Sequence, residues 1–321
     1  MWLQIRLYLL VALMFGLLYG LIVGVAAALG YSNFIVYAVI SFVMVGIQYL
    51  LGPTIVGWAM KVRYVSEQEK PELHLMVAEL ARTAGIPKPK VGISRLSIPN
   101  AFAFGRWQGD GRVCVTEGIV RLLNKNELRA VLGHEISHLK HRDMALITLL
   151  SVIPMICWYI AWGLMWARGG RDRNGGYTAL IGIGAFLLYF ITNLLVLYGS
   201  RIREYYADLG SVQVGNPPHQ LATALYKLVY SNARMPKEAL KQGEGLKAFF
   251  VNDPSKAWNE IRELKQIDLD MSGTIDADEL MALRSKKVRI GFSDKLMEIF
   301  STHPNMLKRI KQLSTLTPTT G

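Results

Sequence analysis

Cysteine and charged residues are scarce in this sequence. Only two of the 321 residues are cysteine, and 19% are charged. Cys114 lies in a predicted strand and Cys157 lies inside a long apolar run, so we expect no disulfide between them. A small fold held together by disulfides is therefore excluded. Because 51% of the residues are hydrophobic, a disordered chain is excluded as well.

Asp, Glu, Lys and Arg are absent from four long stretches of the chain. The stretches are Leu7–Leu29, Phe34–Met60, Met144–Ala167 and Tyr177–Gly199. Each is long enough to cross the hydrocarbon core of a bilayer as a helix, which takes about 20 residues. We therefore predict four transmembrane helices in two hairpins, and a simple soluble enzyme is excluded.

Basic residues flank these runs and contribute to the net charge of +12, among them Arg6, Lys140 and Arg201. Basic flanks are typical of membrane spans, and we find no basic stripe interleaved with aromatics that would indicate a nucleic-acid partner. The uncharged Gly30–Asn33 turn predicts that both termini and the polar segments face the cytoplasm of a multi-pass plasma-membrane protein. The loop Arg168–Gly176, with three arginines, conflicts with this orientation unless the second hairpin does not fully span.

The polar segment between the two hairpins mixes strand and helix patterns. Val91–Ser94, Ala101–Arg106 and Arg112–Glu117 are typical of short strands. A capping box predicts a helix over Asn124–Arg142. The predicted fold class is a mainly α membrane protein that carries an α+β domain with a small β-sheet.

The string His134-Glu135-Ile136-Ser137-His138 lies inside this predicted helix. Two histidines four residues apart leave the same helical face, so both imidazoles can reach one Zn²⁺. Glu135 is then placed to take a proton from the water that attacks the substrate. The alternative is a pair of surface histidines without a metal.

A catalytic zinc site needs a third protein ligand. His141 lies on the same face as His134 but ~10 Å farther along the helix axis, too far for one ion. Glu204 follows the fourth apolar run, and the histidine helix precedes the third. An antiparallel pair of spans would therefore set Glu204 beside both histidines. Asp208, one turn farther, would fix a ligand imidazole by a hydrogen bond. Ordinary salt bridges at an exposed helix start are the alternative.

In this combination the chain resembles the HtpX-type membrane zinc metalloproteases, relatives of the CAAX prenyl proteases. The resemblance rests on two apolar hairpins, His134-Glu135-x-x-His138, Glu204-x-x-x-Asp208 and Ser301-Thr302-His303-Pro304. It implies a cytoplasm-facing endopeptidase in quality control and stress response, with membrane proteins as polypeptide substrates. It also implies zinc on the two histidines and Glu204, with Glu135 as the base. The family often has a second proline where this sequence has Asn305.

Two further segments are candidates for contact with the substrate. His303 is a candidate for stabilising the oxyanion, and a structural histidine beside Pro304 is the alternative. Asn100, Ala101 and Phe102 resemble the family segment that lies beside the catalytic helix. An edge strand there would pair with an extended peptide through backbone hydrogen bonds. An ordinary core strand is the alternative.

A second metal pattern stands near the end of the chain. Residues 268–279 match the calcium loop D-x-[DN]-x-[DN]-G-x5-E with one substitution. The expected ligands are Asp268, Asp270, Ser272, the carbonyl of Thr274, Asp276 and Glu279. This EF-hand-like insert predicts a Ca²⁺ site that alters access to the zinc cleft, and a capped acidic turn without an ion is the alternative.

The resemblance implies a zincin-like (gluzincin) metalloprotease domain that the second hairpin interrupts. The predicted parts are the N-terminal hairpin (1–60), the metalloprotease part with the zinc helix (61–143), the second hairpin (144–200), the part with the third ligand (201–253), the EF-hand-like insert (254–291) and the C-terminal metalloprotease part (292–321).

Two other functions remain open from the sequence. An intramembrane protease of the site-2 type needs its zinc helix within the bilayer, where Lys140, Arg142 and Asp143 would be costly. A non-catalytic calcium-responsive membrane scaffold would have no use for Glu135. The membrane zinc endopeptidase is the interpretation that the sequence favours.

Overall fold

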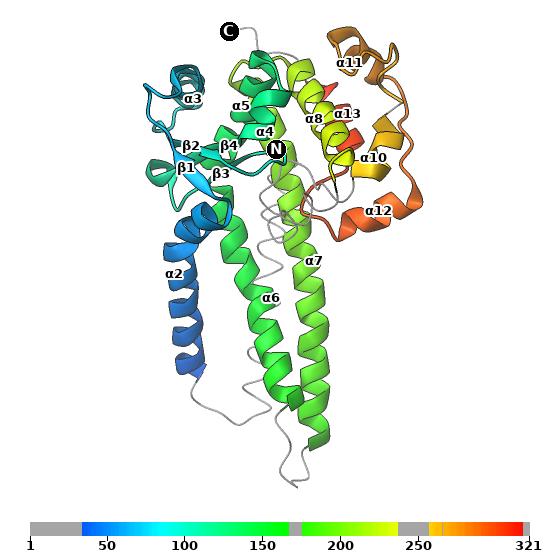
Figure 1. Cartoon of the computed structure of the whole chain (residues 1–321). Helices are drawn as coiled ribbons and strands as arrows, with labels where there is room; N and C mark the ends of the chain where they lie inside the picture. The colour runs from blue at the N-terminus through cyan, green and yellow to red at the C-terminus, as the bar shows by residue number, and fades with distance from the viewer. Residues whose placement is uncertain (1–33, 167–174, 237–256, 265, 317–321) are drawn as a thin grey trace. The chain divides into compact units, whose positions relative to one another are not determined.

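The computed structural model describes residues 34–166, 175–236, 257–264 and 266–316 (Figure 1). The chain divides into two compact units. One takes the described parts of Met1–Leu51 and Ala145–Ile202, and the other takes those of Gly52–Met144 and Arg203–Gly321. The first predicted span and most of the arginine-containing loop lie outside the described residues.

Long apolar helices build the first unit. They are the main parts of α2 (Phe34–Ala59), α6 (Asp143–Trp166) and α7 (Gly175–Gln213). α6 and α7 share a small apolar core that includes Ile153 and Ala185. In the described chain, Ala179–Gln213 is the one helix long and apolar enough to cross a membrane, and Leu150–Trp162 is a shorter apolar helix. The fourth predicted span thus corresponds to a helix that is long and apolar enough to cross a membrane, whereas the other three spans stay predictions.

A small mixed sheet lies in the second unit. Its strands are β1 (Val62–Tyr64), β2 (Lys90–Ser94), β3 (Ala101–Phe104) and β4 (Arg112–Thr116), in the order β1-β2-β4-β3. β2 and β4 are parallel, and the two outer pairs are antiparallel. β3 is therefore an edge strand, which is one of the two possibilities that the sequence leaves open for the candidate substrate segment.

Helices cover this sheet and extend the core. They are α3 (Pro71–Ala84), α4 (Glu117–Leu122), α5 (Lys125–His141), α8 (Pro218–Ala233), α10 (Ala257–Leu264), α11 (Ala277–Leu283), α12 (Phe292–Ile299) and α13 (Met306–Leu313), with a 3₁₀ turn at Gln108–Asp110. α5 contacts α3, α8 and β3 and thus lies in the middle of the unit (Figure 1). The predicted mainly helical fold with a small sheet is confirmed.

The helices α10 and α11 are part of the packed core and do not form a separate lobe. Both contact α8 and α13 (Figure 1). Leu264, Ile275 and Leu280 belong to the same apolar cluster as Leu132 of α5. The segment predicted as an insert therefore shares its core with the helix that carries the two histidines.

Candidate metal centre

The helix that carries the histidines begins at a strong local signal and then runs through the core. Asn124 caps α5, and its own backbone N–H donates a hydrogen bond to the carboxylate of Glu127, which completes a capping box. His134 and Glu135 are only 1% and 4% exposed. The predicted helix Asn124–Arg142 is thus confirmed to within one residue at each end.

Two glycines allow α5 to approach the last turns of α7 closely. A Cβ on Gly210 would lie 2.1 Å from Ser137 Oγ, and one on Gly133 would lie 2.4 Å from the amide nitrogen of Asn216. Real Cβ atoms do not come this close, so a side chain at either position would push the helices apart. The close approach places the residues of α7 near position 204 opposite the histidines of α5.

The structure brings the three predicted zinc ligands together. His134 Nε2 lies 3.1 Å from His138 Nε2. Glu204 Oε2 lies 3.6 Å from the His134 nitrogen, and Glu204 Oε1 lies 3.6 Å from the His138 nitrogen. Ligand atoms at the corners of a tetrahedron around Zn²⁺ would be about 3.3–3.6 Å apart, given bond lengths of 2.0–2.2 Å. The spacing of the three side chains therefore fits one ion.

A carboxylate holds the outer nitrogen of each histidine. Asp208 lies 2.9 Å from His134 Nδ1, and Asp143 lies 2.7 Å from His138 Nδ1. Both Nδ1 atoms are therefore donors, and both Nε2 lone pairs face the same space. Two lone pairs 3.1 Å apart repel each other unless a cation or a proton lies between them. The donor set thus fits a metal ion.

The carboxylates around His138 change its pKa. Burial lowers the pKa of His138, but the hydrogen bond and charge of Asp143, together with Glu204, raise it to about 9. A divalent ion at Nε2 would require the neutral form of this imidazole, so the binding of metal would release a proton from His138.

Arg309 of α13 is a part of the site that the sequence interpretation missed. Its guanidinium is fully buried and lies 2.9 Å from Glu204 and 2.6 Å from Asp208. Burial lowers the pKa of Arg309, but these two carboxylates raise it above its usual value. A signal was present in the sequence, because Arg309 stands on the apolar stripe formed by Met306, Ile310 and Leu313.

Asp143 is the second residue missed, since its charge suggested only a membrane flank. It forms a buried ion pair with Arg203, which fixes the carboxylate that holds His138.

The metal centre and its neighbours contain more acidic than basic groups. Four carboxyl groups (Asp143, Glu204, Asp208 and Glu135) outnumber the two guanidinium groups of Arg203 and Arg309. This excess of negative charge favours a divalent cation at the centre.

His303, in the loop before α13, also lies beside Glu204. Its Nδ1 lies 3.3 Å from the carboxylate of Glu204, and the described residues offer Nε2 no hydrogen-bond partner. Asn305, at the position of the second proline in the family pattern, accepts a hydrogen bond from Leu307 and caps α13. It also donates to Glu263 of α10 at 2.6 Å. The asparagine that departs from the family pattern thus caps α13 and connects this helix to α10.

The other residues that the sequence interpretation considered lie at the edge strand, at the end of α5 and in the predicted calcium loop. Asn100 directly precedes the edge strand β3, which holds Ala101 and Phe102 and contacts α5. His141 is turned away, with its Nδ1 2.9 Å from the carbonyl oxygen of Ser137. In the predicted calcium loop, oxygens of Asp268, Asp270 and Glu279 lie within 4.8 Å of one another. In the same loop, Asp276 caps α11, while Ser272 and Thr274 hydrogen-bond to each other.

Comparison with known proteins gives a consistent result. Residues 67–317 match the model of peptidase family M48. The protease HtpX homolog of Methanothermobacter thermautotrophicus is 51% identical over 243 residues, which cover 76% of this chain and 92% of that protein. The homolog from Moorella thermoacetica is 35% identical over 296 residues, covering 90% and 86%.

A solved structure supports the fold alone. The crystal structure of S. mikatae Ste24p aligns with a TM-score of 0.50 at 15% identity, covering 96% of this chain and 67% of that chain. The likeness extends over nearly the whole length, although the sequences have diverged.

Proposed function

The chain belongs to peptidase family M48 and is a metalloprotease, and on this basis we propose a membrane-bound zinc endopeptidase that cleaves misfolded or unassembled membrane proteins at the cytoplasmic face. Membership of the family confirms the resemblance to HtpX-type proteases. The observation that carries the proposal is the pair of imidazole nitrogens that face each other at 3.1 Å beside Glu204.

The proposed zinc ligands are His134, His138 and Glu204. When bound, Zn²⁺ supplies a Lewis acid that lowers the pKa of a water molecule toward ~7 and polarises the scissile carbonyl. Asp208 and Asp143 orient the two imidazoles through their Nδ1 atoms. The geometry is thus set before a substrate arrives.

Glu135 is the proposed general base. It directly follows His134 on α5 and is buried, so its carboxylate acts in a site from which bulk water is excluded. In the proposed mechanism it takes a proton from the attacking water and delivers it to the departing amine. His303 is the proposed donor to the carbonyl oxygen through Nε2, which has no hydrogen-bond partner among the described residues, while Nδ1 faces Glu204.

The edge strand β3 is the proposed track for the substrate backbone. Asn100 exchanges hydrogen bonds with Thr116 of β4, so the next residue that pairs with β4 is Phe102. The backbone groups of Ala101 and Ala103 therefore point away from β4. An extended peptide could pair with them through backbone hydrogen bonds, with little sequence specificity. Weak specificity suits a protease that removes unfolded segments.

The exposed face of α7 supports attachment to a membrane. Leu180, Ile183 and Leu187 are each more than half exposed, which is costly in water but favourable in lipid. Lys140 and Arg142 at the end of α5 are exposed, which disfavours a site-2-type protease with this helix at mid-membrane. The buried, oriented metal centre disfavours a non-catalytic scaffold.

Metal analysis combined with an activity assay tests the proposal. Wild type and Glu135→Gln should each bind one zinc per chain, whereas the variant should cleave an unfolded membrane protein at least ~100-fold more slowly. Glu117→Gln, an exposed carboxyl on α4, is the control. Equal cleavage by wild type and Glu135→Gln would remove Glu135 from the mechanism. Unchanged zinc affinity in Glu204→Ala would refute the third ligand.

A further inference from the structure

A second group of oxygen ligands lies in the loop between α10 and α11. Carboxylate oxygens of Asp268, Asp270 and Glu279 come within 4.8 Å of one another. Gly273 has a φ of +78°, the left-handed conformation that a calcium loop needs at its sixth position. Among the described residues, these three acids form no salt bridge, so no cationic side chain offsets their mutual repulsion.

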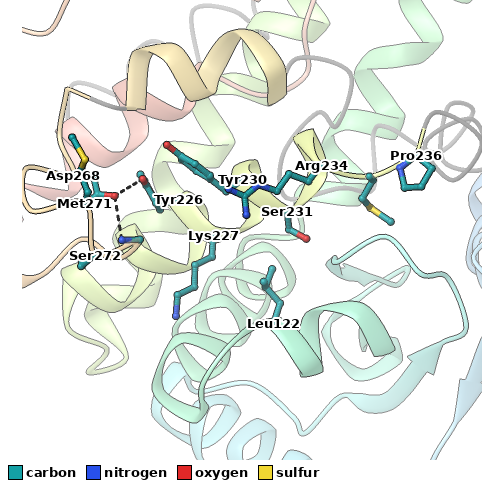
Figure 2. Close-up of a pocket in the computed structure, with 12 residues that line it drawn as sticks. Leu122, Tyr226, Lys227, Tyr230, Ser231, Arg234, Pro236, Asp268, Met271 and Ser272 are labelled. Atoms are coloured by element: carbon teal, nitrogen blue, oxygen red, sulfur yellow. Dashed lines mark hydrogen bonds between the residues drawn. The ribbon is translucent and has the colours of Figure 1, made fainter.

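Asp268 carries the observation that points to a bound ion. The residue is only 8% exposed. Its Oδ2 accepts a hydrogen bond from the Tyr226 hydroxyl at 2.5 Å (Figure 2) and another from the backbone of Gly273 at 3.2 Å. Its Oδ1 is buried and accepts no hydrogen bond from any described residue. A buried carboxylate oxygen without a donor is costly, and a cation would satisfy it.

The loop is held in place independently of any ion. The hydroxyl of Thr223 on α8 donates to the carbonyl of Ile275 at 2.7 Å and accepts from its amide at 3.0 Å. Tyr226, one turn farther along α8, holds Asp268. Asp268 and Tyr226 line the same pocket, which has a volume of about 780 Å³. Figure 2 shows their side chains facing each other. The ligand positions are thus partly set before binding, which lowers the entropic cost of binding.

We propose that residues 268–279 bind Ca²⁺ and that the bound ion stabilises the position of α13. The ligands are the carboxylates of Asp268, Asp270 and Glu279, with the Ser272 hydroxyl and the Thr274 carbonyl. An all-oxygen set in a flexible loop suits Ca²⁺, which takes six to eight oxygens, better than Mg²⁺ or Zn²⁺.

Both helices beside the loop hold α13. On the α10 side, Glu260 accepts a hydrogen bond from the backbone of Met306, the first residue of α13. On the α11 side, Lys311 of α13 donates to the carbonyl oxygens of Leu283 and Arg284, at 2.5 and 2.9 Å. Because α13 carries Arg309, an ion that fixes the loop also steadies the partner of Glu204 and Asp208. Only this consequence for catalysis rests on the proposed function.

Calcium titration of the full-length chain in detergent tests the binding site without any activity assay. Calorimetry should show one Ca²⁺ site with a Kd between about 10 µM and 1 mM, and Mg²⁺ should bind more weakly. Asp270→Asn, at an exposed ligand position, should weaken binding at least about tenfold. Asp278→Asn, an exposed acid of α11 outside the ligand positions, is the control. No binding at about 5 mM Ca²⁺, or equal losses in both variants, would overturn the site.

Hydrogen exchange tests the link to α13. Ca²⁺ should slow amide exchange in residues 277–283 and 306–313 of wild type but not of Asp270→Asn. Calcium binding with unchanged exchange in α13 would overturn the link. A chain that binds Ca²⁺ as expected but lacks peptidase activity would contradict the proposed function and leave the calcium site intact.

Discussion

Removing the guanidinium of Arg309 should destabilise the metal-free protein strongly. Arg309 is fully buried and contacts Glu204 and Asp208 at 2.6–2.9 Å. Arg309→Met keeps most of the side-chain volume but leaves two buried carboxylates without their cation. Breaking a buried pair in this way costs about 3–5 kcal/mol. We expect a loss of this size in the free energy of unfolding, measured by denaturant titration in detergent after removal of metal.

Zinc should reduce this cost, because the ion places positive charge beside the same carboxylates. The zinc-loaded Arg309→Met variant should therefore lose less unfolding free energy than the metal-free one. A double variant that also carries Asp208→Asn tests the cause, since removing both charges should cost less than the two single changes added together. Arg289→Met, at an exposed position, is the control. A loss below about 1 kcal/mol in metal-free Arg309→Met would refute this account of the site.

Three further changes test other contacts. Asp143→Asn should weaken zinc binding about 10–100-fold in a chelator competition, because this carboxylate orients His138; unchanged affinity would contradict that role. Gly210→Ala should lower the free energy of unfolding by about 1–3 kcal/mol, because the new Cβ would clash with the side chain of Ser137. Adding Ser137→Gly should restore the stability by removing that side chain. A Gly210→Ala variant as stable as wild type would contradict the close approach of the two helices. Burial raises the pKa of Asp110, but its ion pairs with Arg106 and Arg112 hold this pKa below its usual value. Wild type should therefore exceed Asp110→Asn in stability above about pH 4 and lose this advantage as the pH falls further. An advantage that persists in acid would oppose this assignment.

Much of the second unit follows from short-range signals in the sequence. The capping box at Asn124 fixes the start of α5, and the four-residue spacing of His134 and His138 fixes their common face. Glu204 could be placed because the third and fourth apolar runs return the chain to its starting level. Ser66 and Glu69 also match the capping-box pattern, which would predict that a helix starts there, but they are an exception. Their hydrogen bonds are present, but they form a turn, and α3 begins only at Pro71, because proline is favoured in the first helical turn.

Long-range ion pairs account for what the sequence interpretation missed. Asp143 looked like a membrane flank, because nothing near it in the sequence indicates that Arg203, on another helix, is its partner. The cap at Asn305 is local, but its bond to Glu263 joins residues 42 positions apart. Such pairs depend on which helices pack together, and hydrophobic periodicity does not determine that.

The positions that break the sequence rules are the ones that build the metal centre. α13 has a well-defined apolar stripe, yet Arg309 stands on it. α5 is buried on most of its surface, although His134 and Glu135 are polar. Each exception would be costly alone, since a charge in a core must be compensated. Together they form one network whose carboxyl groups exceed its guanidinium groups, and a divalent ion balances that excess. A charge on an apolar stripe is therefore a useful sequence signal for a buried site of this kind.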